Sequence, residues 1–131
     1  MHAHADEAVF QHKLILISVN RTGKIAQISL YDAVRYSWKI SPERAEKADY
    51  MLAVTDGEIV GAFEANEWLP ATKDNFPEFS PADRPWGIRE GRWAFRGREA
   101  PVDVKALYLG KSVPKELRKR GAANPIRYVG L

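Results

Sequence analysis

The side chains of this sequence that could perform chemistry begin with three histidines, His2, His4 and His12. All three precede the first run of residues with strand character. A catalytic histidine needs a rigid support, so we do not expect a serine–histidine site at this end of the chain. His2 and His4 have a spacing that could touch a metal ion, but no third ligand accompanies them in the sequence. We therefore expect neither a metal site nor a histidine-based catalytic site.

The glycines do not form a phosphate-binding or nucleophile motif. Their spacing matches neither a Gly-rich nucleotide-binding loop nor a Gly-x-Ser-x-Gly turn. Since no nucleophile–base pair is visible, an enzyme is a less favoured interpretation than a binding protein, and no cofactor is expected.

Four tryptophans, Trp38, Trp68, Trp86 and Trp93, are the second group of candidates. A tryptophan in a folded protein is more often a core residue than the wall of a ligand pocket, and this interpretation stays open for each of them. Rings at the rim of a small β-structure can instead stack on a flat nucleobase, which contributes ~1–3 kcal/mol per base.

Two polar segments form the third group. Ser18 and Asn20 lie at the end of the first apolar run, where an amide can read a base edge or simply cap the following turn. Lys111 lies between Gly110 and Ser112, before a predicted helix, and this segment could hold a phosphate or form an ordinary loop.

The hydrophobic pattern predicts the elements that position these residues. Apolar and alternating runs predict strands over 13–19, 50–55, 58–65, 92–96 and 125–129. Capping residues and helical spacing predict one helix starting at Ser29 with Leu30, Ala33, Val34 and Trp38 on one face, and others over 41–48, 101–107 and 114–120. Asp56-Gly57 predicts a tight hairpin turn, and the proline-rich residues 70–91 predict a long loop.

This order of elements predicts the α+β class. We expect a small, mixed, strongly bent sheet of five to six strands, or a partly open β-barrel, with flanking helices. Residues 1–12 are expected to form an N-terminal extension or short helix, and residues 13–131 a single domain.

Composition limits the class of protein further. The 131 residues contain no cysteine and no apolar run of the roughly 20 residues that a membrane helix needs, so we expect a cytoplasmic protein without membrane contact. The net charge is +3, and the stretch from Lys105 to Arg127 holds seven Lys or Arg against one acid. Such a segment is typical either of a phosphate-binding surface or of a solvated charged face.

In several patches the chain resembles the PUA-like superfamily, in particular its EVE, YTH and ASCH domains. The patches are residues 14–18, 36–38, 49–54, 59–64 and 91–95. The segment 124–129, Asn-Pro-Ile-Arg-Tyr-Val, is similar instead to the end of a recurring small bacterial domain. The resemblance implies a small β-barrel with flanking helices that holds a modified base in an aromatic pocket. It further implies that Trp38 forms the pocket, with Ser18 and Asn20 beside it and Trp68 as a second wall.

The leading hypothesis is therefore a nucleic-acid or nucleotide-binding module, including a reader of a modified base. In this hypothesis the base lies against Trp38, and Arg92, Arg96, Lys111 and Arg127 hold phosphates. Two alternatives stay open. One is a protein-interaction or regulatory module of a bacterial defence or toxin system, using the loop with Trp86, and the other is a small nucleotide- or RNA-acting enzyme using Lys111.

Overall fold

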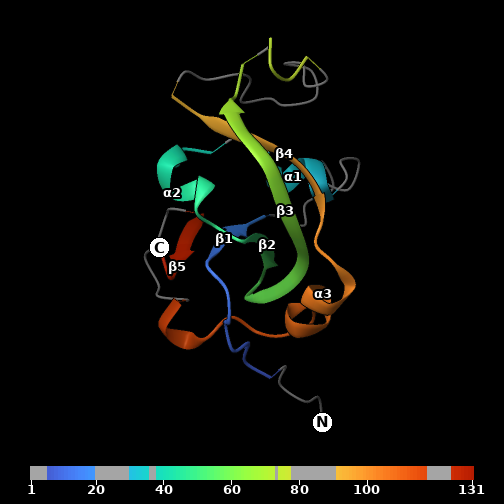
Figure 1. Ribbon diagram of the computed structural model, residues 1–131. Helices are drawn as coiled ribbons and strands as arrows, with labels where there is room; N and C mark the ends of the chain where they lie inside the picture. Colours follow the sequence, from blue (N-terminus) through green and yellow to red (C-terminus); the bar gives the residue numbers. More distant parts are fainter. Residues whose placement is uncertain (1–5, 20–29, 36–37, 73, 78–90, 118–124) are drawn as a thin grey trace.

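The computed structural model describes residues 6–19, 30–35, 38–72, 74–77, 91–117 and 125–131 (Figure 1). These residues form five strands, three α-helices and a short 3-10 helix. In chain order they are β1 (Leu14–Ser18), α1 (Leu30–Arg35), α2 (Pro42–Glu46), β2 (Tyr50–Thr55), β3 (Glu58–Pro70), β4 (Trp93–Glu99), α3 (Val102–Tyr108), η2 (Lys115–Leu117) and β5 (Ile126–Val129).

The strands form one mixed sheet in the order β4-β3-β2-β1-β5. β1 runs parallel to β2 and antiparallel to β5, and the other pairs are antiparallel. β3 is the long curved strand of Figure 1, and it pairs with β2 over its first half and with β4 over its second. The expected α+β class and mixed five-stranded sheet are confirmed, while the PUA-like fold stays a prediction. Among the described strands β4 and β5 do not pair with each other, so the sheet is open between these edges.

Both faces of the sheet are covered, and β1 carries buried apolar side chains on each side. Leu14 and Leu16 belong to the cluster that α3 completes with Val104 and Tyr108. Ile15 and Ile17 point to the opposite face, as alternation along a strand requires, and belong to a second cluster. That cluster is completed by α1 and α2 and by aromatic residues of β3 and β4. The run of buried residues in β1 is thus that of a strand covered on both sides.

Two local structures follow directly from their residue types. Asp56 and Gly57 have φ angles of 52° and 80° and join β2 to β3, which confirms the predicted hairpin. α2 begins with Pro42, and the Ser41 side chain accepts a hydrogen bond from the Arg44 N–H. The predicted start of this helix is therefore confirmed as well.

Four predicted elements need correction. α1 ends at Arg35, and Trp38 forms a β-bridge with Trp93, so Trp38 is not part of the helical face on which the sequence placed it. β3 extends to Pro70 and β4 to Glu99, because the two strands stabilise each other beyond the predicted ends. The described part of the predicted basic helix is only the 3-10 turn η2. The predicted N-cap at Ser29, the turn beginning at Asn20 and residues 118–124 lie outside the described residues.

The described part of the N-terminal segment packs along the domain. The Ala8 N–H donates to the Ser112 carbonyl at 2.9 Å, and the Ser112 N–H donates to the Asp6 carbonyl at 2.8 Å. Ala8 is buried in the same cluster as Tyr108. The segment therefore contributes to the core on the α3 side of the sheet.

Candidate nucleic-acid interface

Trp38 and Trp93 lie side by side at the edge strand of the sheet. Each N–H donates to the carbonyl of the other at 2.8 Å, so the two residues form a hydrogen-bonded antiparallel pair. Side chains of directly opposite residues project from the same face of such a pair. Both tryptophans are half-buried against the core cluster on the α1 and α2 side. The bridge thus places two partly exposed tryptophans opposite each other at the edge of the sheet.

The indole of Trp38 is held by a second contact. Its Nε1–H donates to the Val34 carbonyl at 2.6 Å. Because this donor is already engaged, a ligand at Trp38 would contact the ring face rather than the N–H group. The geometry therefore favours stacking, which any base can satisfy.

Trp68 occupies a different environment from Trp38. It is 6% exposed and its ring lies 5.0 Å from that of Phe95, at an interplanar angle of 55°. Its Nε1 is buried and has no acceptor among the described residues. The structure thus places Trp68 in the core, and the residue paired with Trp38 through the main chain is Trp93. The sequence offered Trp93 as one of four tryptophan candidates but did not pair it with Trp38, since only the fold shows that residues 38 and 93 are paired.

Ser18 ends β1 with an exposed side chain, and its N–H donates to the Pro125 carbonyl at 2.9 Å. Asn20, predicted to read a base edge beside it, lies outside the described residues. Their assignment as base-contacting residues stays a prediction.

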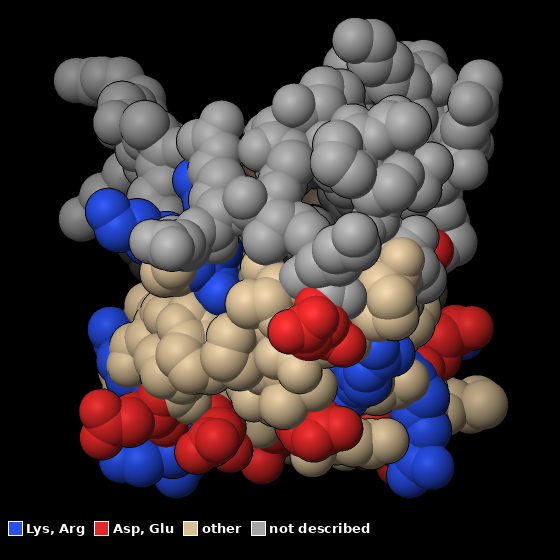
Figure 2. Space-filling view, turned by 90° about the horizontal axis from the view of Figure 1, so that it is seen from above, with Lys and Arg blue, Asp and Glu red and all other residues tan. Residues whose placement is uncertain are grey.

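The four predicted phosphate-binding residues do not share one surface. Arg92 flanks β4 and Arg96 lies within it, whereas Arg127 lies on β5, at the opposite edge of the sheet. Lys111 follows α3, and its carbonyl accepts from Ile59 beside the β2–β3 turn. On the face seen in Figure 2, Lys and Arg alternate with Asp and Glu over the described part instead of forming a single patch. This arrangement does not form a continuous row of phosphate-binding side chains through all four residues.

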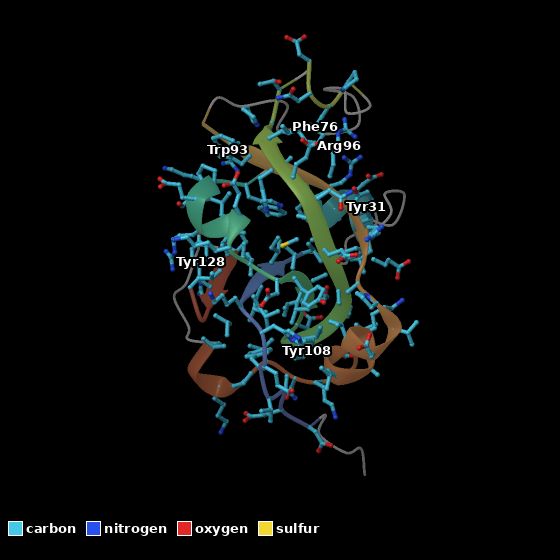
Figure 3. The ribbon with its side chains drawn as sticks, viewed as in Figure 1. Tyr31, Phe76, Trp93, Arg96, Tyr108 and Tyr128 are labelled. Carbon is cyan, nitrogen blue, oxygen red and sulfur yellow. The ribbon has the colours of Figure 1, made fainter. Side chains whose placement is uncertain are left out.

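Within this set, Arg96 is tied to the segment that follows β3. Its guanidinium carbon lies 4.7 Å from the ring centre of Phe76, and its Nη2 donates to the Asn75 carbonyl. Arg35 of α1 lies near the same ring, at 5.7 Å, and forms an ion pair with Asp32 at 2.8 Å. Figure 3 shows Phe76, Arg96 and Tyr31 together at the upper end of the molecule. These arginines hold a buried aromatic residue in place.

A cation that the sequence did not single out lies on the α2 side. The guanidinium carbon of Arg44 is 3.6 Å from the ring centre of Tyr128, and Arg44 Nη2 donates to the main-chain oxygen of Leu131 at 3.2 Å. The Tyr128 hydroxyl accepts from the Ser41 N–H at 3.3 Å, so the ring is fixed against the start of α2. In Figure 3, α2 lies between the labelled Trp93 and Tyr128. No sequence signal connects residues 44 and 128, because the contact depends on the position of β5.

A third group of polar and aromatic residues lies on the α3 side of the sheet. The Tyr108 ring is fully buried, and its hydroxyl accepts from the Gln11 N–H at 3.0 Å. His12 Nδ1 is 2.6 Å from the same oxygen and forms a second hydrogen bond with this hydroxyl. Tyr50 contacts the His12 ring edge to face, with centroids 5.1 Å apart. Because Gln11 and His12 both bond the hydroxyl of buried Tyr108, this group joins the N-terminal segment to α3.

Among the described residues, the pKa values of Tyr50 and Arg98 are shifted. Burial raises the pKa of Tyr50, and the negative charges of Glu64, Asp103 and Asp49 add to the shift, followed by Tyr108. The hydrogen bond and charge of Glu64 raise the pKa of Arg98, whose Nε donates to that carboxylate at 2.6 Å. Both shifts accompany structural contacts and lie away from Trp38.

Over the described ranges, no three His, Asp or Glu side chains gather as a metal site would require. No helix in the described part of the chain is both long and apolar enough to cross a bilayer.

Comparison of the chain with protein-family models, curated proteins and solved structures finds no match.

Proposed function

We propose that the chain is a nucleic-acid or nucleotide-binding module of PUA-like fold that holds a base, unmodified or modified, against Trp38. The observation that carries the proposal is the main-chain pairing of Trp38 with Trp93, which places two half-buried tryptophans opposite each other at one edge of the sheet. Four tryptophans are distributed along the chain, and a fold that only needed core volume would not require these two to remain partly accessible.

The fixed position of Trp38 supports binding by stacking. Its main chain is held by the bridge to Trp93 and its ring by the bond to Val34. A group that is ordered before binding loses little conformational entropy when the ligand arrives. Stacking then contributes ~1–3 kcal/mol per base.

The same energies favour an unpaired base over one in a duplex. Extracting a base from a duplex costs a few kcal/mol, which is comparable to what one stacked ring returns. A single strand requires no such extraction. We therefore propose that single strands, or bases already unpaired, bind in preference to intact duplex.

Fluorescence polarisation tests this proposal directly. Purified protein is titrated into labelled short single- and double-stranded DNA and RNA, with and without a methylated base, at two salt concentrations. We expect single strands to bind more tightly than duplexes, and more weakly at the higher salt because phosphate contacts release counterions.

The decisive variant is Trp38→Ala, with Trp38→Phe beside it. The loss of one stacked ring should weaken binding from about 5-fold to more than 100-fold. Trp38→Phe keeps a ring and should retain most of the affinity. Phe95→Leu, which loosens the fully buried core without changing a surface ring, controls for stability. Equal affinity of Trp38→Ala and wild type, or no binding to any oligonucleotide, would contradict the proposal.

A further inference from the structure

The indole N–H of Trp68 is a buried hydrogen-bond donor without an acceptor. Trp68 is 6% exposed, and its Nε1 atom has no hydrogen-bond partner among the described residues. A donor that leaves water and gains no acceptor costs the folded protein the full desolvation free energy of that group. Because most buried polar groups in native proteins are bonded, this exception calls for a physical explanation.

The pairing of the strands places Trp68 on the same face of the sheet as Trp38. Trp68 lies directly opposite Phe95 of β4, and Trp93 is two residues before Phe95 on that strand. Trp93 in turn lies opposite Trp38. Residues two apart on a strand, and residues directly opposite each other on paired strands, project from the same face. In agreement with this register, all four aromatic residues belong to or pack against the core cluster on the α1 and α2 side.

The separation of Trp38 and Trp68 suits a ligand of the size of a base. Across the sheet the two residues are two strand spacings apart, or about 10 Å. Two indole side chains with one base between them are long enough to span this distance. A base that stacks on the half-buried Trp38 can therefore place its edge at the Trp68 donor.

Trp93 lies between these two residues, and its side chain is the one that can move to admit a ligand. The Trp38 ring is held by the bond from its N–H to the Val34 carbonyl. The Trp93 ring is half-buried, and no described residue forms a hydrogen bond with its indole N–H. Changes of side-chain rotamer at a binding site are common even where the main chain hardly moves.

An ordered water is a poorer partner than a base for the Trp68 donor. A buried water makes roughly two to four hydrogen bonds with the polar groups around it. The cluster around Trp68 consists of apolar and aromatic side chains, and Trp68 Nε1 is its one unpartnered buried polar side-chain atom in the described part of the chain. A base suits these surroundings because its faces stack on aromatic rings and its edge carries nitrogen or oxygen acceptors.

We propose that Trp68 is the hydrogen-bond donor of the base-binding site, and that its indole N–H donates to a ring nitrogen or carbonyl oxygen on the edge of the base stacked on Trp38. The Trp93 ring turns aside to admit the base. This inference rests on the proposed function and deepens it, because it adds edge recognition to stacking. The free protein carries the cost of the unbonded donor, and binding of the base removes that cost.

The test uses the whole chain and short single strands, each made of one base type, and takes forward the strand that binds most tightly in polarisation titrations. NMR of isotope-labelled protein resolves the indole N–H signals, which Trp38→Phe and Trp68→Phe assign. In the free protein the Trp68 signal should lie upfield of the Trp38 signal, because the Trp38 N–H already has an acceptor. Addition of the strand should move the Trp68 signal downfield as its N–H gains an acceptor.

Affinity gives a second readout. Trp68→Phe keeps an aromatic ring and removes the donor, so it should weaken binding of the strand about 3- to 10-fold, the effect of one neutral hydrogen bond. Phe95→Leu is the matched control, because it loosens the same cluster and leaves the donor in place. This control should bind the strand like the wild type.

The outcomes separate this inference from the proposed function. If the Trp68 signal does not move and Trp68→Phe binds like the wild type while Trp38→Ala loses affinity, the donor assignment is wrong and the proposed function stands. If Phe95→Leu weakens binding as much as Trp68→Phe, the effect of the substitution is structural and the donor assignment fails as well. If no strand binds, both proposals fail.

Discussion

The hydroxyl of Tyr108 joins two segments that are 96 residues apart in the chain. It accepts the N–H of Gln11 and lies 2.6 Å from His12 Nδ1, while the ring is 0% exposed in the core on the α3 side. A buried hydroxyl with two partners stabilises a fold mainly because those partners would otherwise be left without a bond. The N-terminal segment is therefore held by a specific polar contact as well as by burial.

Tyr108→Phe should lower the free energy of unfolding by about 1–3 kcal/mol, since it removes the acceptor of the Gln11 N–H and the partner of His12 while keeping the ring. Urea denaturation followed by circular dichroism measures the change. Tyr50→Phe is the matched control, because the Tyr50 ring also contacts His12. Equal stability of the two variants would contradict the role given to the Tyr108 hydroxyl.

Tyr50 makes the stability of the fold sensitive to alkali. Its pKa is raised above the ordinary value of 10.0, by burial first and then by nearby carboxylates. A group with a raised pKa in the folded state binds its proton longer there than in the unfolded chain. Its contribution is therefore complete below pH 10 and is lost as the pH rises through the folded-state pKa.

In a spectroscopic titration of tyrosinate absorbance, the wild type should show a late-ionising tyrosine that Tyr50→Phe lacks. Urea unfolding of the two proteins above pH 10 should show a smaller loss of stability with pH in Tyr50→Phe. A tyrosinate curve unchanged by the substitution would exclude Tyr50 as the late-ionising group.

At the scale of elements, the β3–β4 pair depends on one glycine. The Gly97 N–H donates to the Tyr31 hydroxyl of α1 at 2.8 Å. A Cβ added at Gly97 would lie 1.9 Å from the Glu64 carbonyl and 2.9 Å from the Ala65 Cα. The pairing register shifts at this point, between Ala65 and Glu67, which brings the backbones of the two strands unusually close.

Gly97→Ala should destabilise the fold by about 3 kcal/mol or more, because the clash is with main-chain atoms that cannot move away independently. Gly91→Ala is the informative comparison. Gly91 has a φ of 78° but nothing within 4 Å of an added Cβ, so this variant measures only the backbone strain of about 1–2 kcal/mol. Thermal unfolding of both variants separates the two effects, and a milder loss in Gly97→Ala than in Gly91→Ala would contradict the close approach.

Local signals explain which elements were predictable from the sequence. The Asp56-Gly57 hairpin and the Ser41-Pro42 helix start depend on adjacent residues, and both are present. The extension of β3 to Pro70 depends on pairing with a strand more than twenty residues away. In the sequence, the polar residues Asn66 and Glu67 instead indicated that the strand ends before them. Trp38 stands four residues after Val34, a spacing that predicted one helical face. In the structure the indole N–H of Trp38 donates to the Val34 carbonyl instead.

At the scale of the molecule, the sheet order decides which predicted site residues can act together. Trp38 was selected from the sequence, whereas its pairing with Trp93 and the contact of Arg44 with Tyr128 arise only through the fold. Conversely, Arg92 and Arg127 are both in the basic half of the sequence and lie at opposite edges of the sheet. Because the order of strands in the sheet differs from their order in the sequence, basic residues that are close together in the sequence do not form one basic surface.

The two-sided burial of β1 predicts where the fold is most sensitive to truncation. Leu16, which is 2% exposed, lies on β1, an interior strand of the sheet, and Leu16→Ala should lower the free energy of unfolding by about 2–5 kcal/mol. Val9→Ala, at a residue 74% exposed, should change it by less than about 0.5 kcal/mol. Urea midpoints of the two variants give the comparison, and similar midpoints would contradict the described core.

The neighbours of β1 in the sheet also have a consequence for the newly made chain. β1 is synthesised first among the described strands, whereas β5, which covers one of its edges, is synthesised last. Until residues 126–129 leave the ribosome, an apolar strand therefore presents an unpaired edge to other nascent chains. During this time β1 can associate with other nascent chains, and a pause in translation just before β5 would lengthen it.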